Sequence, residues 1–448
     1  MDKLQPGTTI KINPVQCFTS NRIDLIFKLI YAESIERNSQ AKYPRDLYKR
    51  HLFSITGGNR KFIEHGNIPP KVGFDQFNEI FLSLINGDVN DFPPVQIDQD
   101  LRLNNGAHRV VAAFLKKELI SAQISEKPRG INADYNFFKA ANRWWYRLNQ
   151  EELDYALLRL TSLNPRIQVL VVFPSMRNKS LLFELRNQKS FFLEREFRLN
   201  PIAKWKLLNL LYPQPENFVN LNPENNRNAF RDRFNAPGKL RIFFFENNES
   251  GYLANLKRTM RSKYRLANGS IHTPDNFIEA SHLLEILLMK NSRINLHNFD
   301  LKYARSLSRR LEEFQPVLRE AAIVGSTPLA LLGIRPSRDL DLISHTGSTF
   351  DSSKSFDVHN VYWESKGFNI DELIENPKNF MSVYGVKYAS IQNIMRFKIL
   401  RHERKDIKDL ILVLRLIIER APIFFRSVKH TTKGYLRLFK NLARKLAK

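Results

Sequence analysis

A pair of aspartates near residue 340, preceded by a Gly-Ser pair, is the part of this sequence whose residue types and spacing best suit chemistry. Asp339 and Asp341 stand one residue apart in the run RDLDLI, so on a strand both side chains would point to one face. Two carboxylates about 7 Å apart along a strand repel each other unless a cation lies between them. Hard divalent ions that bridge substrate phosphates take such oxygen ligands, so the pattern predicts a metal site for phosphate chemistry.

The residues before the aspartates would position a phosphate beside that site. Residues 321–324 form a short apolar run, which is typical of a buried strand. Gly325 and Ser326 follow, where a glycine lets the backbone approach a ligand closely. The next helix would begin with its free N–H groups directed at the same place. We therefore expect a strand, a turn, a short helix and a second strand, with Leu340 and Leu342 in the core.

This arrangement resembles the motif of the polymerase-β-like nucleotidyltransferase superfamily, in which a Gly-Ser turn is followed, after a spacer, by two acids one residue apart. The resemblance implies that Gly325 and Ser326 hold a nucleoside triphosphate and that Asp339 and Asp341 bind Mg²⁺. It also implies a third acid on a following strand, which would be a metal ligand or a base. Asp357 in the run SFDVHN is the best match for that position.

The third acid has two competitors in the sequence. Asp351 and Glu364 both lie near Asp357. Asp357 is preferred because Phe356 and Val358 flank it in the alternation that a strand requires.

A basic helix after the acids agrees with a phosphate site. Residues 390–420 carry a helical pattern in which Lys398, Arg401 and Lys405 recur at steps of three and four. A helix packs beside the catalytic sheet in small members of the same superfamily, and the resemblance implies that these three cations offset the charge of the triphosphate. A solvated basic face on an ordinary helix is the alternative interpretation.

A second phosphate site is predicted in the first third of the chain. Residues 95–117 indicate a hairpin of two strands and then an Asn-Gly turn into a helix. His108 and Arg109 fall in the first helical turn, where free N–H groups attract anions and the guanidinium adds a forked donor. A structural His-Arg pair at an ordinary helix start is the alternative.

This segment resembles the ParB/sulfiredoxin fold, whose signature Gly-x-His-Arg precedes an Ala-rich helix. The resemblance implies that Gly106, His108 and Arg109 bind nucleotide phosphates. Members of this fold that act as small-molecule kinases also need an acidic base, and Glu64 in the Gly-rich stretch 57–71 is the candidate.

The amino-acid composition limits the classes of protein to which this chain can belong. Hydrophobic residues make up 43% of the 448 residues, which is enough for several folded domains. Lysine and arginine (70) exceed aspartate and glutamate (45), and the resulting charge of +25 favours anionic partners. Cys17 is the only cysteine, and the sequence shows no secretion signal or long apolar run, so we expect a protein of the reducing cytoplasm.

The predicted fold class is α/β or α+β with several domains. We expect a ParB/sulfiredoxin-like domain at 1–125, a helical connector at 126–165, a middle α/β domain of unknown role at 166–300, a nucleotidyltransferase-like mixed sheet with helices at 301–420 and a basic amphipathic tail at 421–448. The tail suits an anionic membrane surface, which would hold the protein peripherally at the inner membrane face. It suits nucleic acid equally well, and a partly disordered basic tail is the third interpretation.

The middle domain contains a weaker constellation. Four potential metal ligands gather near one predicted helix start: His272, Asp275, Glu279 and His282. Their spacing matches no known zinc motif, so helix capping and solvent contact are the preferred interpretation. Two continuous apolar runs, 169–173 and 240–245, predict strands of a sheet that is buried on both faces.

Together these features predict a Mg²⁺-dependent nucleotidyltransferase. It would transfer a nucleoside monophosphate from ATP or CTP to a small acceptor, such as a phosphorylated polyol or sugar, while its N-terminal domain binds a second nucleotide and acts in the manner of a kinase. The pairing of the two domains resembles uncharacterised bacterial surface-polysaccharide proteins. The alternatives are a transferase of antitoxin or defence type, which modifies nucleic acid or protein and binds CTP through its ParB-like domain, and a non-catalytic scaffold. Nucleic acid is not the favoured partner, because the sequence shows no recognisable module that binds it.

Overall fold

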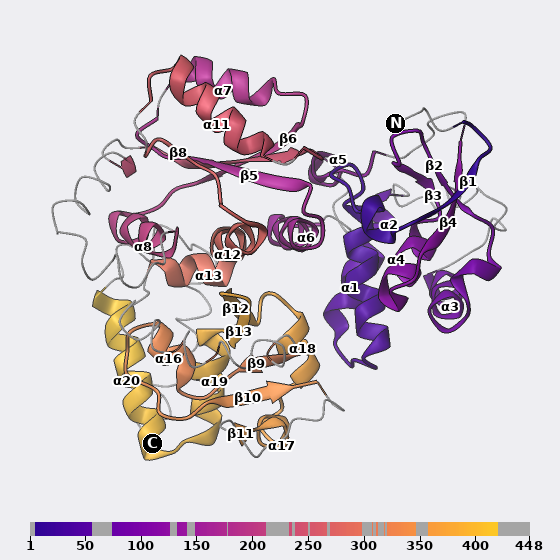
Figure 1. The fold of residues 1–448 in the computed structure, drawn as a ribbon. Coiled ribbons are helices and arrows are strands. Elements are labelled where there is room, and N and C mark those ends of the chain that lie inside the picture. The colour runs from indigo at the N-terminus through magenta and orange to yellow at the C-terminus, as the bar shows by residue number, and fades with distance from the viewer. Residues whose placement is uncertain are drawn as a thin grey trace. The chain divides into compact units, whose positions relative to one another are not determined.

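The computed structural model describes residues 5–55, 74–125, 132–140, 148–176, 178–211, 233–234, 238–249, 251–266, 269–297, 320–345 and 357–419, together with Leu307, Leu311 and Leu318. The predicted mixed α/β class is confirmed (Figure 1). The chain divides into two compact units. Unit 1 comprises residues 1–197 and 227–281, and unit 2 comprises residues 198–226 and 282–448. The finer five-part division stays a prediction. Glu64 and the tail 421–448 lie outside the described residues.

Unit 1 begins with a mixed sheet of the order β1-β4-β2-β3. Its strands are β1 (Thr9–Ile12), β2 (Val95–Ile97), β3 (Leu103–Asn105) and β4 (Ile120–Ile124). Strand β4 is antiparallel to β1 and parallel to β2, and the β2–β3 pair is the predicted hairpin. The surrounding helices are η1 (Pro14–Cys17), α1 (Asp24–Glu36), α2 (Lys42–Ile55), α3 (Phe74–Asn86), η3 (Val89–Asp91) and α4 (Ala107–Lys116).

A buried ion cluster fixes the position of α1 in this part of the unit. Asp24 accepts hydrogen bonds from Nε of Arg22 (2.8 Å) and from Nζ of Lys28 (2.8 Å), and all three residues are buried. These two cations hold the pKa of the Asp24 carboxyl far below its usual range, against the effect of burial. The second guanidinium arm of Arg22 donates to the Leu103 carbonyl (2.6 Å), so the cluster ties α1 to β3.

The rest of unit 1 is built on an antiparallel sheet of the order β6-β7-β5-β8. Its strands are β5 (Ile167–Val172), β6 (Phe191–Phe197), β7 (Leu240–Glu246) and β8 (Ile271–His272). The two apolar runs predicted as strands are β5 and β7, and their side chains are mostly buried on both faces. The associated helices are α5 (Tyr135–Ala140), α6 (Gln150–Leu163), α7 (Lys179–Arg186) and α11 (Tyr252–Lys263). Helix α12 (Phe277–Leu288) crosses from unit 1 into unit 2 at residue 282.

Unit 2 contains a sheet of the order β11-β10-β9-β13-β12. Its strands are β9 (Ala321–Ile323), β10 (Asp341–Ser344), β11 (Asp357–Val358), β12 (Phe380–Val383) and β13 (Val386–Ala389). Strand β10 is antiparallel to β9 and parallel to β11. The helices are α8 (Pro201–Leu211), α13 (Lys290–Leu296), α16 (Thr327–Leu331), α17 (Asn360–Glu364), α18 (Ile370–Glu375), α19 (Ile391–Arg401) and α20 (Arg404–Glu419).

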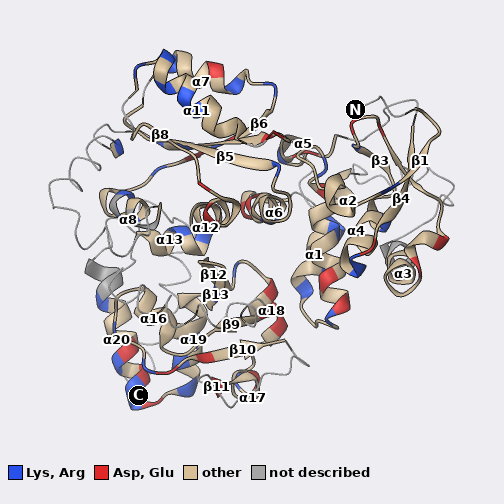
Figure 2. Ribbon diagram, in the orientation of Figure 1, with Lys and Arg blue, Asp and Glu red and all other residues tan. Residues whose placement is uncertain are grey.

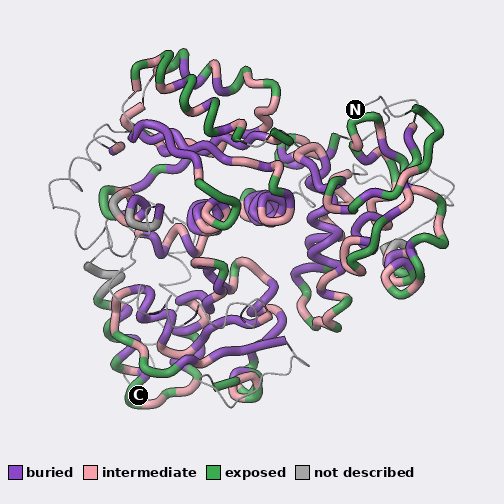
Figure 3. Tube along the Cα trace, in the orientation of Figure 1, coloured by how far each residue is buried: buried purple, intermediate pink, exposed green. Residues whose placement is uncertain are grey.

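Hydrophobic residues cover both faces of the unit 2 sheet. Ala322 of β9 packs into one core and Ile323 into the other, as the alternation of a strand requires. The first core includes Trp363, whose ring stacks on Phe397 at a centroid distance of 4.1 Å. Figure 3 shows β9 and most of β10 as buried segments. Gly325 follows β9 and Asp341 begins β10, so this buried strand pair positions both residues.

The single helix predicted over residues 390–420 is wrong. The segment forms α19 and α20, and His402 between them adopts φ +62 and caps the end of α19. Asp406 at the start of α20 accepts hydrogen bonds from Lys398 and Arg401 of α19, and from the Glu403 N–H (3.2 Å). These bonds stabilise a corner that helical periodicity alone does not reveal.

Figure 2 shows acidic and basic residues interleaved along α20. In the described part of the chain, no helix has the length and apolar character needed to cross a membrane.

Candidate metal centre and phosphate-binding turn

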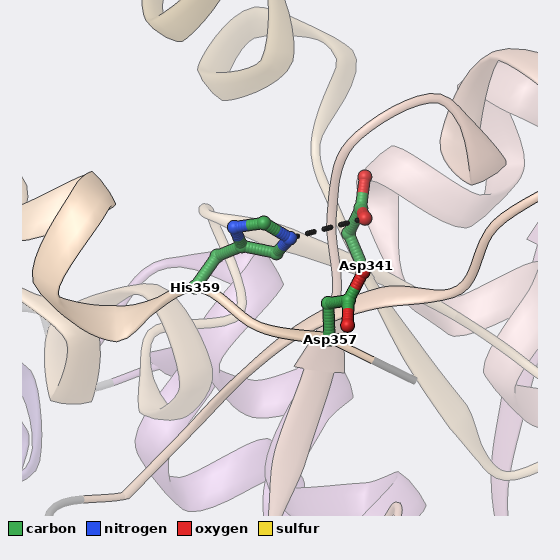
Figure 4. A group of neighbouring side chains, drawn as sticks. All are labelled: Asp341, Asp357 and His359. Carbon is green, nitrogen blue, oxygen red and sulfur yellow. Dashed lines mark hydrogen bonds and ion pairs between the residues drawn. The ribbon is translucent and has the colours of Figure 1, made fainter. Parts of the chain in front are cut away.

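Asp341, Asp357 and His359 come together at one end of the unit 2 sheet. Strand β11 pairs with β10 in a register that places Asp357 opposite Asp341. Each of the three residues offers a ligand atom within 4.8 Å of the others, and Nε2 of His359 lies 3.1 Å from Oδ1 of Asp341 (Figure 4). Two carboxylates and an imidazole fit a divalent cation, because each supplies a lone pair and the carboxylates supply negative charge. Among the described residues, no other group of three or more meets this distance.

Gly325 lies directly against the carboxylate of Asp341. A Cβ atom at position 325 would be 2.7 Å from Cγ of Asp341 and still closer to Oδ2, so a larger residue would displace this side chain. Gly325 also has φ +66, a conformation that residues with a side chain rarely adopt. The main chains meet as well, because the Val324 N–H donates to the Asp341 carbonyl (2.8 Å). The predicted turn and one predicted acid therefore face each other.

A group of hydroxyls fixes the loop that joins the turn to β10. Oγ of Ser337 lies 2.9 Å from Oγ of Ser326 and 2.9 Å from Oγ1 of Thr327. Ser337 and Thr327 both donate to the Asp339 carbonyl, at 2.8 and 3.1 Å. Asp339 is thus held by its backbone while its side chain is exposed.

Asp339 and Asp341 do not share a strand face as predicted, because β10 begins at Asp341. Asp339 lies in a bend before the strand and does not belong to the group of ligand atoms. Of the predicted acids, the structure brings together Asp341 and Asp357. Glu364, the described alternative to Asp357, is exposed on α17 and also lies outside the group.

Sequence reasoning missed His359 as a site residue. It stands two residues after Asp357, a spacing that places alternate side chains on one face of an extended segment, and this signal could have identified it. The hydrogen bond with Asp341 raises the pKa of His359, and the charge of Asp357 acts in the same direction. A bound cation would compete with the proton on this imidazole.

The three predicted phosphate-binding cations have acidic partners. Nζ of Lys398 is buried and lies 3.1 Å from Asp406 and 2.8 Å from Asp409. Arg401 also pairs with Asp406, with Nε 2.7 Å from Oδ2. Lys398 and Arg401 therefore stabilise the corner between α19 and α20. Arg401 additionally lowers the pKa of His359, which links it electrostatically to the acidic cluster.

Lys405 and Arg335 complete this ion network. Lys405 is exposed and lies 3.1 Å from Glu403. Arg335 donates to both carboxylate oxygens of Asp409, at 2.6 and 3.0 Å. Arg335 belongs to the loop that leads to Asp339, so its ion pair with Asp409 anchors that loop to α20.

The structure brings Gly106, His108 and Arg109 together at the start of α4, as predicted. Gly106 has φ +100, and a Cβ there would lie 2.6 Å from Cγ1 of Val95. Nε2 of His108 lies 2.7 Å from the Tyr48 hydroxyl, and burial lowers the pKa of His108 to about 3, so this imidazole is neutral. Arg109 donates to the Pro93 carbonyl. A nucleotide site at this helix start stays a prediction.

The potential metal ligands near residue 275 include a helix-capping group at the start of α12. Nε2 of His272 lies 3.0 Å from Oε1 of Glu279, and Oε2 of Glu279 accepts the Asp275 N–H at 2.6 Å. Both oxygens of the carboxylate are therefore engaged at the start of α12. His282 packs edge-on against Tyr384, at a centroid distance of 5.2 Å.

Comparison with protein-family models, with curated proteins and with solved structures gives no match. The geometry and chemistry of the site are therefore the basis for a proposed function.

Proposed function

We propose that unit 2 is a metal-dependent nucleotidyltransferase, which moves a nucleoside monophosphate from a nucleoside triphosphate such as ATP or CTP to a small acceptor. The observation that carries the proposal is the position of Asp341. Its carboxylate lies against Gly325 and within ligand distance of both Asp357 and His359. Phosphate oxygens at the turn formed by Gly325 and Ser326 would therefore be next to a metal-binding group.

The site residues have two tasks in this proposal, which are to bind the cation and to accept the proton of the acceptor hydroxyl. Asp341, Asp357 and His359 would hold the cation, which is Mg²⁺ or, because an imidazole takes part, a metal with greater affinity for nitrogen such as Mn²⁺. When bound, the cation supplies positive charge to the phosphate oxygens during transfer. The pairing of β10 with β11 keeps the two carboxylates opposite each other. Asp357 is exposed and can accept a proton from an acceptor hydroxyl.

The release of pyrophosphate tests the proposal. Purified full-length protein, incubated with Mg²⁺ or Mn²⁺, labelled nucleoside triphosphates and a pool of polyols, sugars and their phosphates, should release pyrophosphate. Asp341→Asn should abolish release, because it removes a ligand charge and leaves the backbone intact. Glu364→Gln is the matched control, since this exposed acid lies outside the cluster. Undiminished release by Asp341→Asn would refute the assignment.

The same assay identifies the acceptor class. Label recovered on a small polyol or sugar supports a role in the synthesis of activated surface-polysaccharide precursors. Label recovered on protein or nucleic acid would instead support the transferase of antitoxin or defence type.

A further inference from the structure

Unit 1 contains a cavity of about 520 Å³, whereas the proposed metal centre belongs to unit 2. The cavity lies at the start of β5, beyond the end of β7, and beside the first turns of α11 and α12. Its volume is within the range of sites for small molecules, about 300–1,000 Å³. Residues from three stretches of the chain, 165–169, 247–257 and 273–280, line it, so it is formed by the tertiary fold and not by one loop.

A largely buried threonine lines the cavity. Thr273 lines the cavity and is only 6% exposed. Among the residues that the structure describes, its hydroxyl has no hydrogen-bond partner. The hydroxyl oxygen is not itself fully buried, so it can donate to an acceptor group of a ligand in the cavity. Thr273 therefore offers a hydrogen-bond donor to a polar ligand in the cavity.

The amino end of α11 borders the same space. Gly251 is its N-cap residue, no side chain caps the helix, and its first turn contains no acid. Leu253 and Ala254 of that first turn line the cavity. Helix α12, by contrast, is capped, because Asn276 accepts the Glu279 N–H at 2.9 Å. The uncapped start of a 12-residue helix favours a negative group through its free N–H groups and its dipole.

Lys257 supplies a cation on the same wall. It lies on α11, lines the cavity, and has no ion pair or hydrogen bond among the described residues. Arg166 also lines the cavity, but its guanidinium donates to Asn164 and to the Gln16 carbonyl. Burial lowers the pKa of Lys257, while the carboxylates of Asp275 and Glu279 act on it in the opposite direction. Asp275 and Glu249, which both line the cavity, are exposed, so water screens part of their charge.

We infer that this cavity binds a small phosphate monoester of a polyol. The phosphate group lies between the Thr273 hydroxyl, the amino end of α11 and the Lys257 ammonium group, which together donate from three directions. The polyol part contacts the side-chain amides of Gln168 and Asn248, which also line the cavity. This site is separate from the nucleotidyltransferase centre, so either assignment can fail without the other.

Calorimetric titration of the full-length protein tests this inference. The buffer contains EDTA, so that no divalent cation at unit 2 can bind phosphate. The probes are glycerol phosphate and inorganic phosphate, with glycerol as the uncharged control. The wild-type protein should bind glycerol phosphate, and Lys257→Met should weaken binding by about tenfold. Thr273→Val, which keeps the shape of the side chain, should weaken it by about threefold.

Arg258→Met is the matched control, because Arg258 is the next residue of α11, is exposed, and does not line the cavity. It should bind glycerol phosphate within about twofold of the wild type, since it loses the same charge at a site that the ligand does not touch. The inference is overturned if the wild type binds neither probe, if glycerol binds as tightly as glycerol phosphate, or if Lys257→Met and Thr273→Val both bind like the wild type.

Discussion

Replacing Gly325 by alanine tests the contact on which the proposed metal centre depends. The added Cβ would lie 2.7 Å from Cγ of Asp341, whereas ordinary van der Waals contact begins at 3.4 Å. The carboxylate must therefore move, and its position relative to Asp357 and His359 must change with it. The backbone adds a second cost, because alanine at φ +66 is less stable than glycine by about 1–2 kcal/mol.

Gly367→Ala separates these two effects. Gly367 also belongs to unit 2 and has φ +76, but a Cβ there meets no atom within 4 Å. This control therefore carries the backbone cost without the collision. Urea denaturation should show a loss of about 1–2 kcal/mol in the free energy of unfolding for Gly367→Ala, and at least that much for Gly325→Ala.

Binding of Mn²⁺, measured by electron paramagnetic resonance, completes the comparison. Gly367→Ala should bind Mn²⁺ like the wild type. Gly325→Ala should bind it more weakly by about tenfold or more, because a ligand is displaced. If the two variants bind Mn²⁺ with the same affinity as the wild type, the cation does not depend on the position of Asp341, and the reasoning is refuted.

Three further changes test charge in unit 2. Burial raises the pKa of Glu285 to about 7, so between pH 4.5 and 7 the folded protein holds a proton that the unfolded chain has lost. The free energy of unfolding should therefore fall by up to about 3 kcal/mol as the pH rises through that range, and Glu285→Gln should show a flatter dependence of this free energy on pH. Lys398→Met removes the buried cation that Asp406 and Asp409 share, while Arg401 and Arg335 still pair with these carboxylates, so urea denaturation should show a loss of about 2 kcal/mol, and a loss under about 0.5 kcal/mol would contradict the buried network. The pKa of His359 is raised above 6.5, so the affinity for Mn²⁺ should fall as the pH is lowered through the raised value. If the Mn²⁺ affinity of His359→Gln shows the same dependence on pH, this imidazole is not a ligand.

Local patterns in the sequence were sufficient to predict the turn and part of the acidic site. The apolar run before Gly325 and the alternation around Asp341 both depend on short-range periodicity, which strands and turns obey closely. His359 was missed because its role depends on the pairing of β11 with β10, which joins residues 16 positions apart at Asp341 and Asp357. Register between strands is set by long-range packing, and a single sequence shows it only indirectly.

The partners of the charged residues were the harder part to predict. A basic stripe that includes Lys398 suggests a solvated or ligand-binding face, yet Asp406 and Asp409 of the next helix neutralise this side chain in the core. His108 likewise meets Tyr48, which is 60 positions away in the sequence. Helical periodicity gives the face on which a residue lies, but only the tertiary fold decides what that face contacts.

The measurement that tests the central claim most directly is anomalous diffraction from crystals soaked with Mn²⁺ and a non-hydrolysable nucleoside triphosphate. We expect a manganese peak within coordination distance of Asp341, Asp357 and His359, with the triphosphate at the turn of Gly325 and Ser326. A manganese peak elsewhere in the protein, with these three side chains free of metal, would contradict it.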